Sequence, residues 1–251
     1  VRDALNWSDK IDEAIRLFSD RTDVQFGCHH WPMWGKKRVI SFLKKQRDLY
    51  KFIHDQTLRL ANKGFSKEEI AEQIKLPQSL SQEFFNRDYY GTVHHNSKAV
   101  FVRYLGYFDG NPSTLYERPP VEIAIRYVEW MGGPAKILEK AKESFDSGDY
   151  RWTAEVLNHV VMADENHEEA KCLLADTLEQ LGYQSESATW RNFFLCGALE
   201  LREGLPPTRD FVPSSGMAAG IPIDQVFKTM AVRLLPEQVD GEVIQVGIDL
   251  T

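Results

Sequence analysis

The strongest constraint on the fold is a series of closely spaced helical patterns between residues 119 and 203. Pro120 opens a segment whose apolar residues recur at helical spacing, Gly132 ends it, and Pro134 stands at the first position of the next helix. Short helices joined by only a few residues bury their apolar faces against their neighbours. The sequence therefore predicts a mainly α fold in this region.

Part of this region also alternates small and large apolar residues at the spacing of a tetratricopeptide-like helix hairpin. The matching positions are Ala141, Phe145, Gly148, Tyr150, Ala154, Leu157, Ala170, Leu174, Ala175, Leu181 and Gly182. Such hairpins bury their faces only by stacking, and they commonly bind other protein surfaces. We therefore expect this region to carry an interaction surface.

The first half of the chain is also largely helical in pattern. Residues 35–64 carry apolar side chains on more than one side of a long helix. Ser66 and Glu69 are spaced as a capping box, which predicts a second, shorter helix directly after it. Residues 6–20 predict an amphipathic helix, with Ser8 as its N-cap.

A short strand-like run at residues 24–27 leads directly into two histidines, His29 and His30. The strand needs a sheet that we do not find in the sequence. An imidazole at the end of a strand can serve as a metal ligand. Zinc requires three or four protein ligands, however, and no second cluster of closely spaced histidines and carboxylates follows. The residues alone leave two readings open, a metal ligand or a packed loop beside two tryptophans.

The densest group of polar and aromatic residues is the stretch 87–112, RDYYGTVHHNSKAVFVRYLGYFDGNP. Asn96 or Ser97 can cap a helix here, which places His94 and His95 at a helix N-terminus. Backbone N–H groups and the helix dipole favour an anion such as sulfate or phosphate at that position. The alternative is that the tyrosines belong to the core, Asn96 only caps the helix, and the histidines are solvated.

Composition excludes several classes of function for these 251 residues. A net charge of −7 argues against a general nucleic-acid binder, whose phosphate contacts need a basic face. Three cysteines at no metal-like spacing form neither a disulfide framework nor a zinc cluster. No apolar run approaches the roughly 18 residues of a membrane span.

The combination of motifs resembles the alkylsulfatases of the metallo-β-lactamase superfamily over essentially the whole chain. The motifs are HHWPxWG at residues 29–35, YYGTxxHN at residues 89–96 and RYLGYFDGNP at residues 103–112, in the order of that family. In this family a metallo-β-lactamase domain carries two zinc ions, an all-helical domain dimerises, and a sterol-carrier-like domain closes the chain. We therefore expect a homodimer.

The resemblance implies a domain organisation as well as a fold class. Residues 1–35 correspond to the last helix-strand piece of the metallo-β-lactamase α/β domain, and residues 36–203 to a tetratricopeptide-like helical dimerisation domain. Residues 204–220, rich in proline and glycine, are a linker. Residues 221–251 start the sterol-carrier-like α+β domain with a helix and then a strand at 243–250. The fold class implied for the chain is mainly α.

The implied reaction is the hydrolysis of a primary alkyl sulfate, such as dodecyl sulfate, to the alcohol and inorganic sulfate. His29 would be the last zinc ligand, with His30 as the alternative. The HxHxDH run that supplies most ligands in the family is absent from this sequence. We therefore expect that this chain holds an incomplete site for the two zinc ions and is inactive by itself.

The resemblance also assigns the substrate site. His95 would be the general acid that protonates the leaving alcohol, with its neighbour His94 as the alternative. Tyr107 would donate a hydrogen bond to the sulfate, with Tyr104 as the alternative. The remaining substrate contacts implied are Tyr90 and Asn96.

A rival interpretation belongs to another functional class. The chain would then be a helical interaction module of the tetratricopeptide type, with no chemistry of its own. A peptide-binding adaptor is the weaker form of this idea, because nothing in it requires the HHWP or YYGTVHHN motifs. The compartment is not fixed by these residues, although relatives in the family are often exported, which favours the periplasm.

Overall fold

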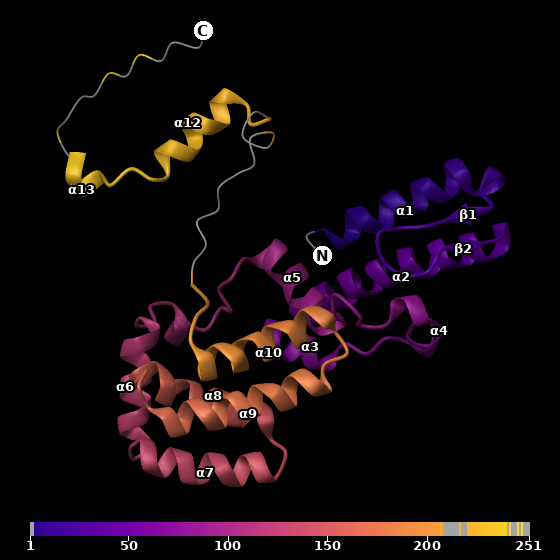
Figure 1. Cartoon of the computed structure of the whole chain (residues 1–251). Helices are drawn as coiled ribbons and strands as arrows, with labels where there is room; N and C mark the ends of the chain where they lie inside the picture. Colours follow the sequence, from indigo (N-terminus) through magenta and orange to yellow (C-terminus); the bar gives the residue numbers. More distant parts are fainter. Residues whose placement is uncertain are drawn as a thin grey trace. The chain divides into compact units, whose positions relative to one another are not determined.

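The structure is a computed structural model that describes residues 3–207, 216, 220–239, 241, 245 and 247. The chain divides into two compact units, Val1–Leu205 and Pro206–Thr251 (Figure 1). Helices make up most of the described residues in both, so the prediction of a mainly α fold is confirmed.

The first unit contains one group of helices before residue 110 and another after it. The first group comprises α1 (Ala4–Phe18), α2 (Lys36–Ala61), α3 (Lys67–Gln73), α4 (Gln78–Ser81) and α5 (Val93–Leu105). The second group comprises α6 (Pro120–Trp130), α7 (Pro134–Asp146), α8 (Tyr150–Ala163), α9 (Glu168–Gln184) and α10 (Ala188–Glu203). We call these the first and the second helical group.

Helix α1 lies along the long helix α2 and begins earlier than the sequence pattern indicated (Figure 1). Its N-cap is Asp3, whose Oδ1 accepts a hydrogen bond from the backbone N–H of Asn6 at 3.0 Å. Ser8, the predicted cap, is buried in the second turn. The prediction was wrong because a carboxylate further upstream satisfies the free N–H groups of the first turn.

The strand-like run finds a partner within the chain. Strand β1 (Val24–Gln25) pairs antiparallel with β2 (Met33–Trp34), with Val24 opposite Trp34. The expectation that this strand depends on a sheet outside the sequence was therefore wrong for the described residues. The loop between the two strands carries the adjacent histidines His29 and His30, and His30 adopts a left-handed backbone conformation with φ of 66°.

The position of α5 is set by the core of the first helical group. The capping box at Ser66 and Glu69 is present and starts α3, as predicted. Helices α2, α3 and α5 then enclose an apolar cluster of Leu60, Ile70, Ile74 and Phe101. Phe101 belongs to α5, so burying it fixes this helix against the other two.

The second helical group consists of successive helices that pack on their neighbours. Helix α8 packs on α6, α7 and α9, and α9 packs on α10. Pro134 stands at the first position of α7, as predicted. The core consists of Ile137, Leu138, Ala141, Val156, Leu157, Val160, Ala170 and Leu174. Several of these are the small and large residues that predicted helix hairpins; their assignment to a tetratricopeptide-like repeat stays a prediction.

The second unit contains α12 (Ile223–Ala231) and α13 (Pro236–Val239) among its described residues. The strand predicted at residues 243–250 lies outside the described residues, apart from positions 245 and 247, and so does most of the predicted linker. Across the described part of the chain, none of the helices combines the length and the apolar character that crossing a membrane requires.

Candidate functional site

Helix α5 begins in the middle of the polar stretch, and its N-terminus is capped by two side chains. Thr92 is the N-cap and accepts a hydrogen bond from the N–H of His95 at 2.8 Å. The Oδ1 atom of Asp88 accepts from the N–H of Val93 at 3.1 Å. The predicted caps, Asn96 and Ser97, lie instead inside the first turns of the helix. That prediction was wrong because Thr92 already supplies the required side-chain oxygen.

The loop that precedes α5 is hydrogen-bonded to the start of α10 in the other helical group. Ser187 and Thr189 each donate a hydroxyl hydrogen bond of 2.7 Å to the backbone carbonyl of Tyr90. The N–H of Ala188 donates to the carbonyl of Tyr89 at 2.8 Å. Ser187 is only 2% exposed, so its hydroxyl is shielded from water. These contacts fix the loop by its backbone and leave the ring of Tyr90 exposed.

Three of the predicted site residues gather around this loop. The ring of His29 stacks on the ring of Tyr90, with centroids 5.2 Å apart. The side-chain amide of Asn96 lies so close to Gly91 that a Cβ atom added there would be 3.1 Å from its Nδ2. Glycine therefore permits the close approach of the amide to the loop. The neighbouring His30 turns away from Tyr90 and packs its ring against Phe84 and Tyr89 instead.

The structure separates Tyr107 from this group along α5. His95 is exposed in the first turn of the helix, whereas Tyr107 follows its last residue and is 83% exposed. The helical rise between His95 and Leu105 is about 15 Å. The alternative residue Tyr104 has its hydroxyl 2.9 Å from Nε2 of the buried His54, which is a structural contact. The pairing of His95 with Tyr107 on one sulfate stays a prediction.

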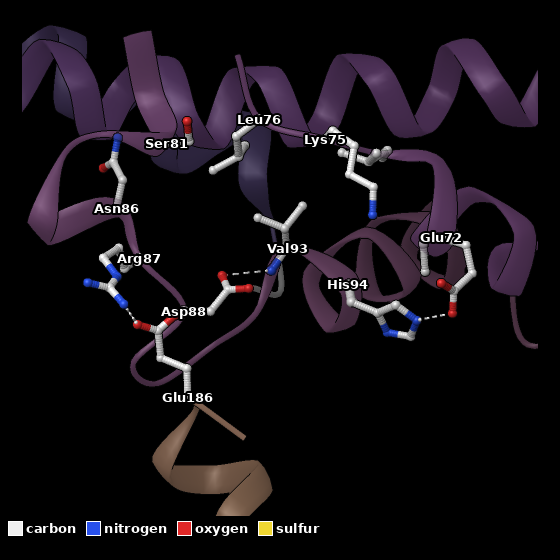
Figure 2. Close-up of a pocket in the computed structure, with 12 residues that line it drawn as sticks. Glu72, Lys75, Leu76, Ser81, Asn86, Arg87, Asp88, Val93, His94 and Glu186 are labelled. Atoms are coloured by element: carbon white, nitrogen blue, oxygen red, sulfur yellow. Dashed lines mark hydrogen bonds and ion pairs between the residues drawn. The ribbon is translucent and has the colours of Figure 1, made fainter. Parts of the chain in front are cut away.

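His94 occupies a different environment from His95. It lines two adjoining cavities of about 400 and 570 Å³, both of which also contact Glu72, Asp88 and Glu186. Its Nε2 lies 3.3 Å from Oε1 of Glu72, and its Nδ1 is buried with no hydrogen-bond partner among the described residues. Figure 2 shows this contact on one side of the smaller cavity and the ion pair of Arg87 with Glu186 on the other.

Burial controls the ionisation of the two groups nearest the α5 N-terminus. Burial lowers the pKa of His94, and the charge of Lys98 lowers it further, while the hydrogen bond that His94 donates to Glu72 raises it. Burial raises the pKa of Asp88, against the lowering effect of the hydrogen bond from Val93. Both shifts favour the neutral form of the side chain. His94 is therefore a poor proton donor at neutral pH.

Sequence reasoning missed most of the side chains that line the two cavities. Glu72 lies in α3, Asp88 before α5, Arg151 in α8 and Glu186 before α10. Arg151 and Glu72 form an ion pair at 2.8 Å, and Glu186 pairs with Arg87. No spacing in the sequence signals this cluster, because its members come from four separate segments.

The side chains do not by themselves form a metal centre. Among the described residues, no group of three or more histidine, cysteine, aspartate and glutamate side chains is placed to hold a metal ion. His29 contacts an aromatic ring, and one imidazole is not enough for a zinc site. The described residues thus do not fit two zinc ions, and we assign no chemical step to a metal within this chain.

These features define a mainly helical domain whose two helical groups meet at a polar loop with exposed aromatic and imidazole side chains. The profile of the alkyl sulfatase dimerisation family matches residues 66–204, which is more than half of the chain. The chain belongs to this family. The resemblance to alkylsulfatases that the sequence motifs indicated is thereby confirmed.

Relatives along the whole chain agree with this assignment. The chain is 51% identical to a linear primary-alkylsulfatase of Pseudomonas sp., over 100% of this chain and 37% of the relative. It is 48% identical to the alkyl/aryl-sulfatase BDS1 of Saccharomyces cerevisiae, over 97% of this chain and 38% of the relative. The solved stereoselective inverting sec-alkylsulfatase Pisa1 from Pseudomonas sp. has a TM-score of 0.92 at 44% identity, covering 96% and 38% of the two chains. The chain thus spans little more than a third of the length of these proteins.

The contrast between the two histidines leads to a first prediction. His94 should titrate below the ordinary histidine pKa, and Glu72→Gln should lower its pKa further, because the glutamate stabilises the imidazolium while Lys98 and Arg151 oppose it. NMR titration of the histidine ring protons measures this, with His94→Gln identifying the signal. A pKa above the ordinary value would contradict the burial of this ring, and a pKa that Glu72→Gln does not move would contradict its contact with Glu72.

The contact between the loop and α10 gives a second prediction. Ser187→Ala removes a hydrogen bond to Tyr90 and the oxygen that caps α10 at Trp190, so we expect a loss of about 1 kcal/mol in the free energy of unfolding. The N–H of Ala188 should also exchange faster with solvent. Hydrogen exchange of the chain measures both changes.

Ser185→Ala is the matched control for this experiment, because the Ser185 hydroxyl donates only to Leu181 within α9. Ser187→Thr, which keeps the hydroxyl, should restore the protection of Ala188. Equal exchange of Ala188 in Ser185→Ala and Ser187→Ala would show that the hydroxyl of Ser187 does not hold the loop.

Proposed function

We propose that this chain supplies the dimerisation domain and part of the substrate site of an alkylsulfatase. The reaction is the hydrolysis of alkyl sulfates, in particular primary ones such as dodecyl sulfate, to the alcohol and inorganic sulfate. The observation that carries the proposal is the 51% identity along the entire chain to a linear primary-alkylsulfatase. The activity belongs to a longer protein, of which this chain corresponds to little more than a third.

The chemistry of the substrate assigns a role to an imidazole. An alkyl sulfate carries a permanent negative charge, and its leaving group is an alkoxide that needs a proton as the C–O or S–O bond breaks. A side chain with a pKa near neutral suits this task. His95 is exposed in the first turn of α5, whereas burial lowers the pKa of His94 and so favours its neutral form. These observations favour His95 as the general acid.

The finer domain assignment is also part of the proposal. Residues 1–35 would complete a metallo-β-lactamase domain, residues 36–203 would form the tetratricopeptide-like dimerisation domain, and residues 221–251 would begin a sterol-carrier-like domain. His29 would contribute one ligand to a pair of zinc ions. The hairpin of β1 and β2 supports this position, because it presents His29 next to Tyr90 in the proposed substrate site.

The proposed partner in dimerisation is a second copy of this chain, and α6 offers a suitable surface. Ala124 is the only buried residue of α6, while Val121 and Ile125, one turn apart, are each 50% exposed. Tyr116, just before the helix, is almost fully exposed. Contiguous apolar surface of this kind marks interaction sites. An obligate dimer built on it would bury well above ~2,000 Å².

The dimer gives a third prediction. The chain should sediment as a homodimer at micromolar concentration, and Ile125→Glu should convert it to a monomer, because a buried unpaired carboxylate is costly. Analytical ultracentrifugation measures the mass. Phe193→Glu is the matched control, since it places the same charge on an exposed apolar residue of α10. A dimer that survives Ile125→Glu and dissociates with Phe193→Glu would move the interface to α10.

The general acid gives a fourth prediction, for the full-length protein that contains this chain. His95→Ala should slow the hydrolysis of dodecyl sulfate by roughly 10²- to 10⁴-fold and largely spare 4-nitrophenyl sulfate, whose leaving group departs as a stable anion. Release of inorganic sulfate measures both rates. His94→Gln is the control and should not discriminate between the two substrates.

Two other outcomes would change the assignment. If His94→Gln discriminates and His95→Ala does not, the acid is His94. If the wild-type full-length protein releases no sulfate from either ester, the chain is better described as an interaction module.

A further inference from the structure

A cavity of about 430 Å³ lies within the second helical group, away from the loop before α5. Its floor consists of Ile137, Ala141 and Val156, which belong to the buried apolar core. Its rim consists of Trp130 at the end of α6, Trp152 of α8, and a row of Lys136, Lys140 and Ser144 along α7. This volume lies in the range of small-molecule sites in proteins, about 300–1,000 Å³.

The two lysines of the rim are not neutralised by carboxylates of the chain. Within the described residues, neither Lys136 nor Lys140 forms an ion pair, whereas Lys142, on the same helix, pairs with Glu169 at 2.6 Å. Lys136 and Lys140 are separated by one helical turn and therefore point to the same side. They make the rim attractive to an anion.

The stem of Lys136 lies close to the turn between α6 and α7. A Cβ atom added at Gly132 would lie 2.9 Å from Cδ and 3.7 Å from Nζ of this lysine. The lysine thus lies closely over Gly132, where a larger residue would displace it. Lys136 also lines the cavity, so its ammonium group is available at the rim.

The two tryptophans give the cavity an apolar side. Trp130 is 87% exposed and Trp152 is 49% exposed, although both indole rings are large and apolar. Exposed rings beside an apolar floor can cover an alkyl chain. This surface differs from the proposed dimer face, because Ile125 and Trp130 lie about 140° apart around α6.

We propose that this cavity binds an amphiphilic anion, with its alkyl chain on the apolar floor between the indoles and its sulfate, sulfonate or carboxylate group on Lys136 and Lys140. The alkyl sulfate of the proposed function is such a ligand, so the inference rests on that function for its natural occupant. The cavity has no imidazole or carboxylate in its lining and holds the ligand without cleaving it. It is a second, non-catalytic site for the substrate class.

The experiment uses the chain with decane-1-sulfonate, which has an alkyl chain and an anionic group but no ester bond to hydrolyse. Isothermal titration calorimetry below the micelle concentration should show saturable binding. Lys136→Gln combined with Lys140→Gln should weaken it at least about tenfold, because a hydrogen bond to a charged group is lost at each position. Decyltrimethylammonium, with the same tail and the opposite charge, should bind more weakly than the sulfonate.

The matched control combines Lys142→Gln with Lys171→Gln, two lysines of α7 and α9 that are already paired with glutamates. It removes the same charge, and the affinity for decane-1-sulfonate should not change. Trp152→Leu keeps an apolar side chain but removes the indole, and should weaken binding of the sulfonate several-fold. Circular dichroism in each titration confirms that the helices stay folded.

Three results would overturn the proposal. The first is that both double variants weaken the binding of decane-1-sulfonate equally, and the second is that the cationic and anionic ligands bind with equal affinity. The third is that the chain binds hexaglutamate and not decane-1-sulfonate, which would make the cavity a peptide site. The test does not depend on catalysis, because it measures binding to the chain alone. A chain that fails to bind decane-1-sulfonate, in a full-length protein that still hydrolyses dodecyl sulfate, would refute this site and leave the proposed function intact.

Discussion

The arrangement of the candidate site depends on the hydrogen bonds that the Tyr90 carbonyl accepts from Ser187 and Thr189. These residues are 97 and 99 positions away along the chain and lie in the other helical group. Helix packing is concentrated within each group, and near the site the two groups are joined by hydrogen bonds to the loop and by ring contacts with Trp190. Each such bond contributes only about 0.5–1.5 kcal/mol, but it requires a specific geometry. The position of the loop therefore depends more on the directional geometry of these hydrogen bonds than on buried apolar area.

The same junction explains why two adjacent histidines have different properties. Both rings contact the ring of Trp190 in α10, with ring centroids 5.5 Å apart for His94 and 6.4 Å apart for His95. Only His94, however, is enclosed between Glu72 of the first helical group and α10 of the second. Enclosure favours the neutral imidazole, and the exposed neighbour keeps its access to solvent and ligand. A change of one position along α5 thus separates a partly buried histidine from an exposed one, and the exposed one is the proposed general acid.

The sequence predicted those parts of the fold that depend on neighbouring residues. The capping box at Ser66 and the proline that opens α7 were both correct, because each acts within one turn of helix. The predicted N-caps of α1 and α5 were wrong. Several side-chain oxygens near each helix start could accept the hydrogen bond, and Asp3 and Thr92 are the ones that do. The two-residue strand β1 pairs with a strand only eight positions further on. Two strands of two residues are too short to show an alternating apolar pattern in the sequence.

The candidate site was predictable only in part, for the same reason. The motif YYGTVHHN identified the loop and the first turn of α5, where Asn96 lies against Gly91 next to Tyr90 and His95 is exposed. Glu72, Arg151 and Glu186 carry no local signal, because they meet the loop only after the two helical groups associate. Tyr107 is near in sequence, but a straight helix of known rise places it beyond the other end of α5.

The occupied N-terminus of α5 also restricts where an anion can bind. Asp88 and Thr92 accept hydrogen bonds from the first-turn N–H groups of Val93 and His95, which would otherwise attract a sulfate. Burial raises the pKa of Asp88, but whenever its carboxyl is ionised it adds a negative charge at the same point. A sulfate held by both His95 and Tyr107 would therefore have to lie along the side of α5. The side chains of the helix, and not its dipole, would then provide the binding energy.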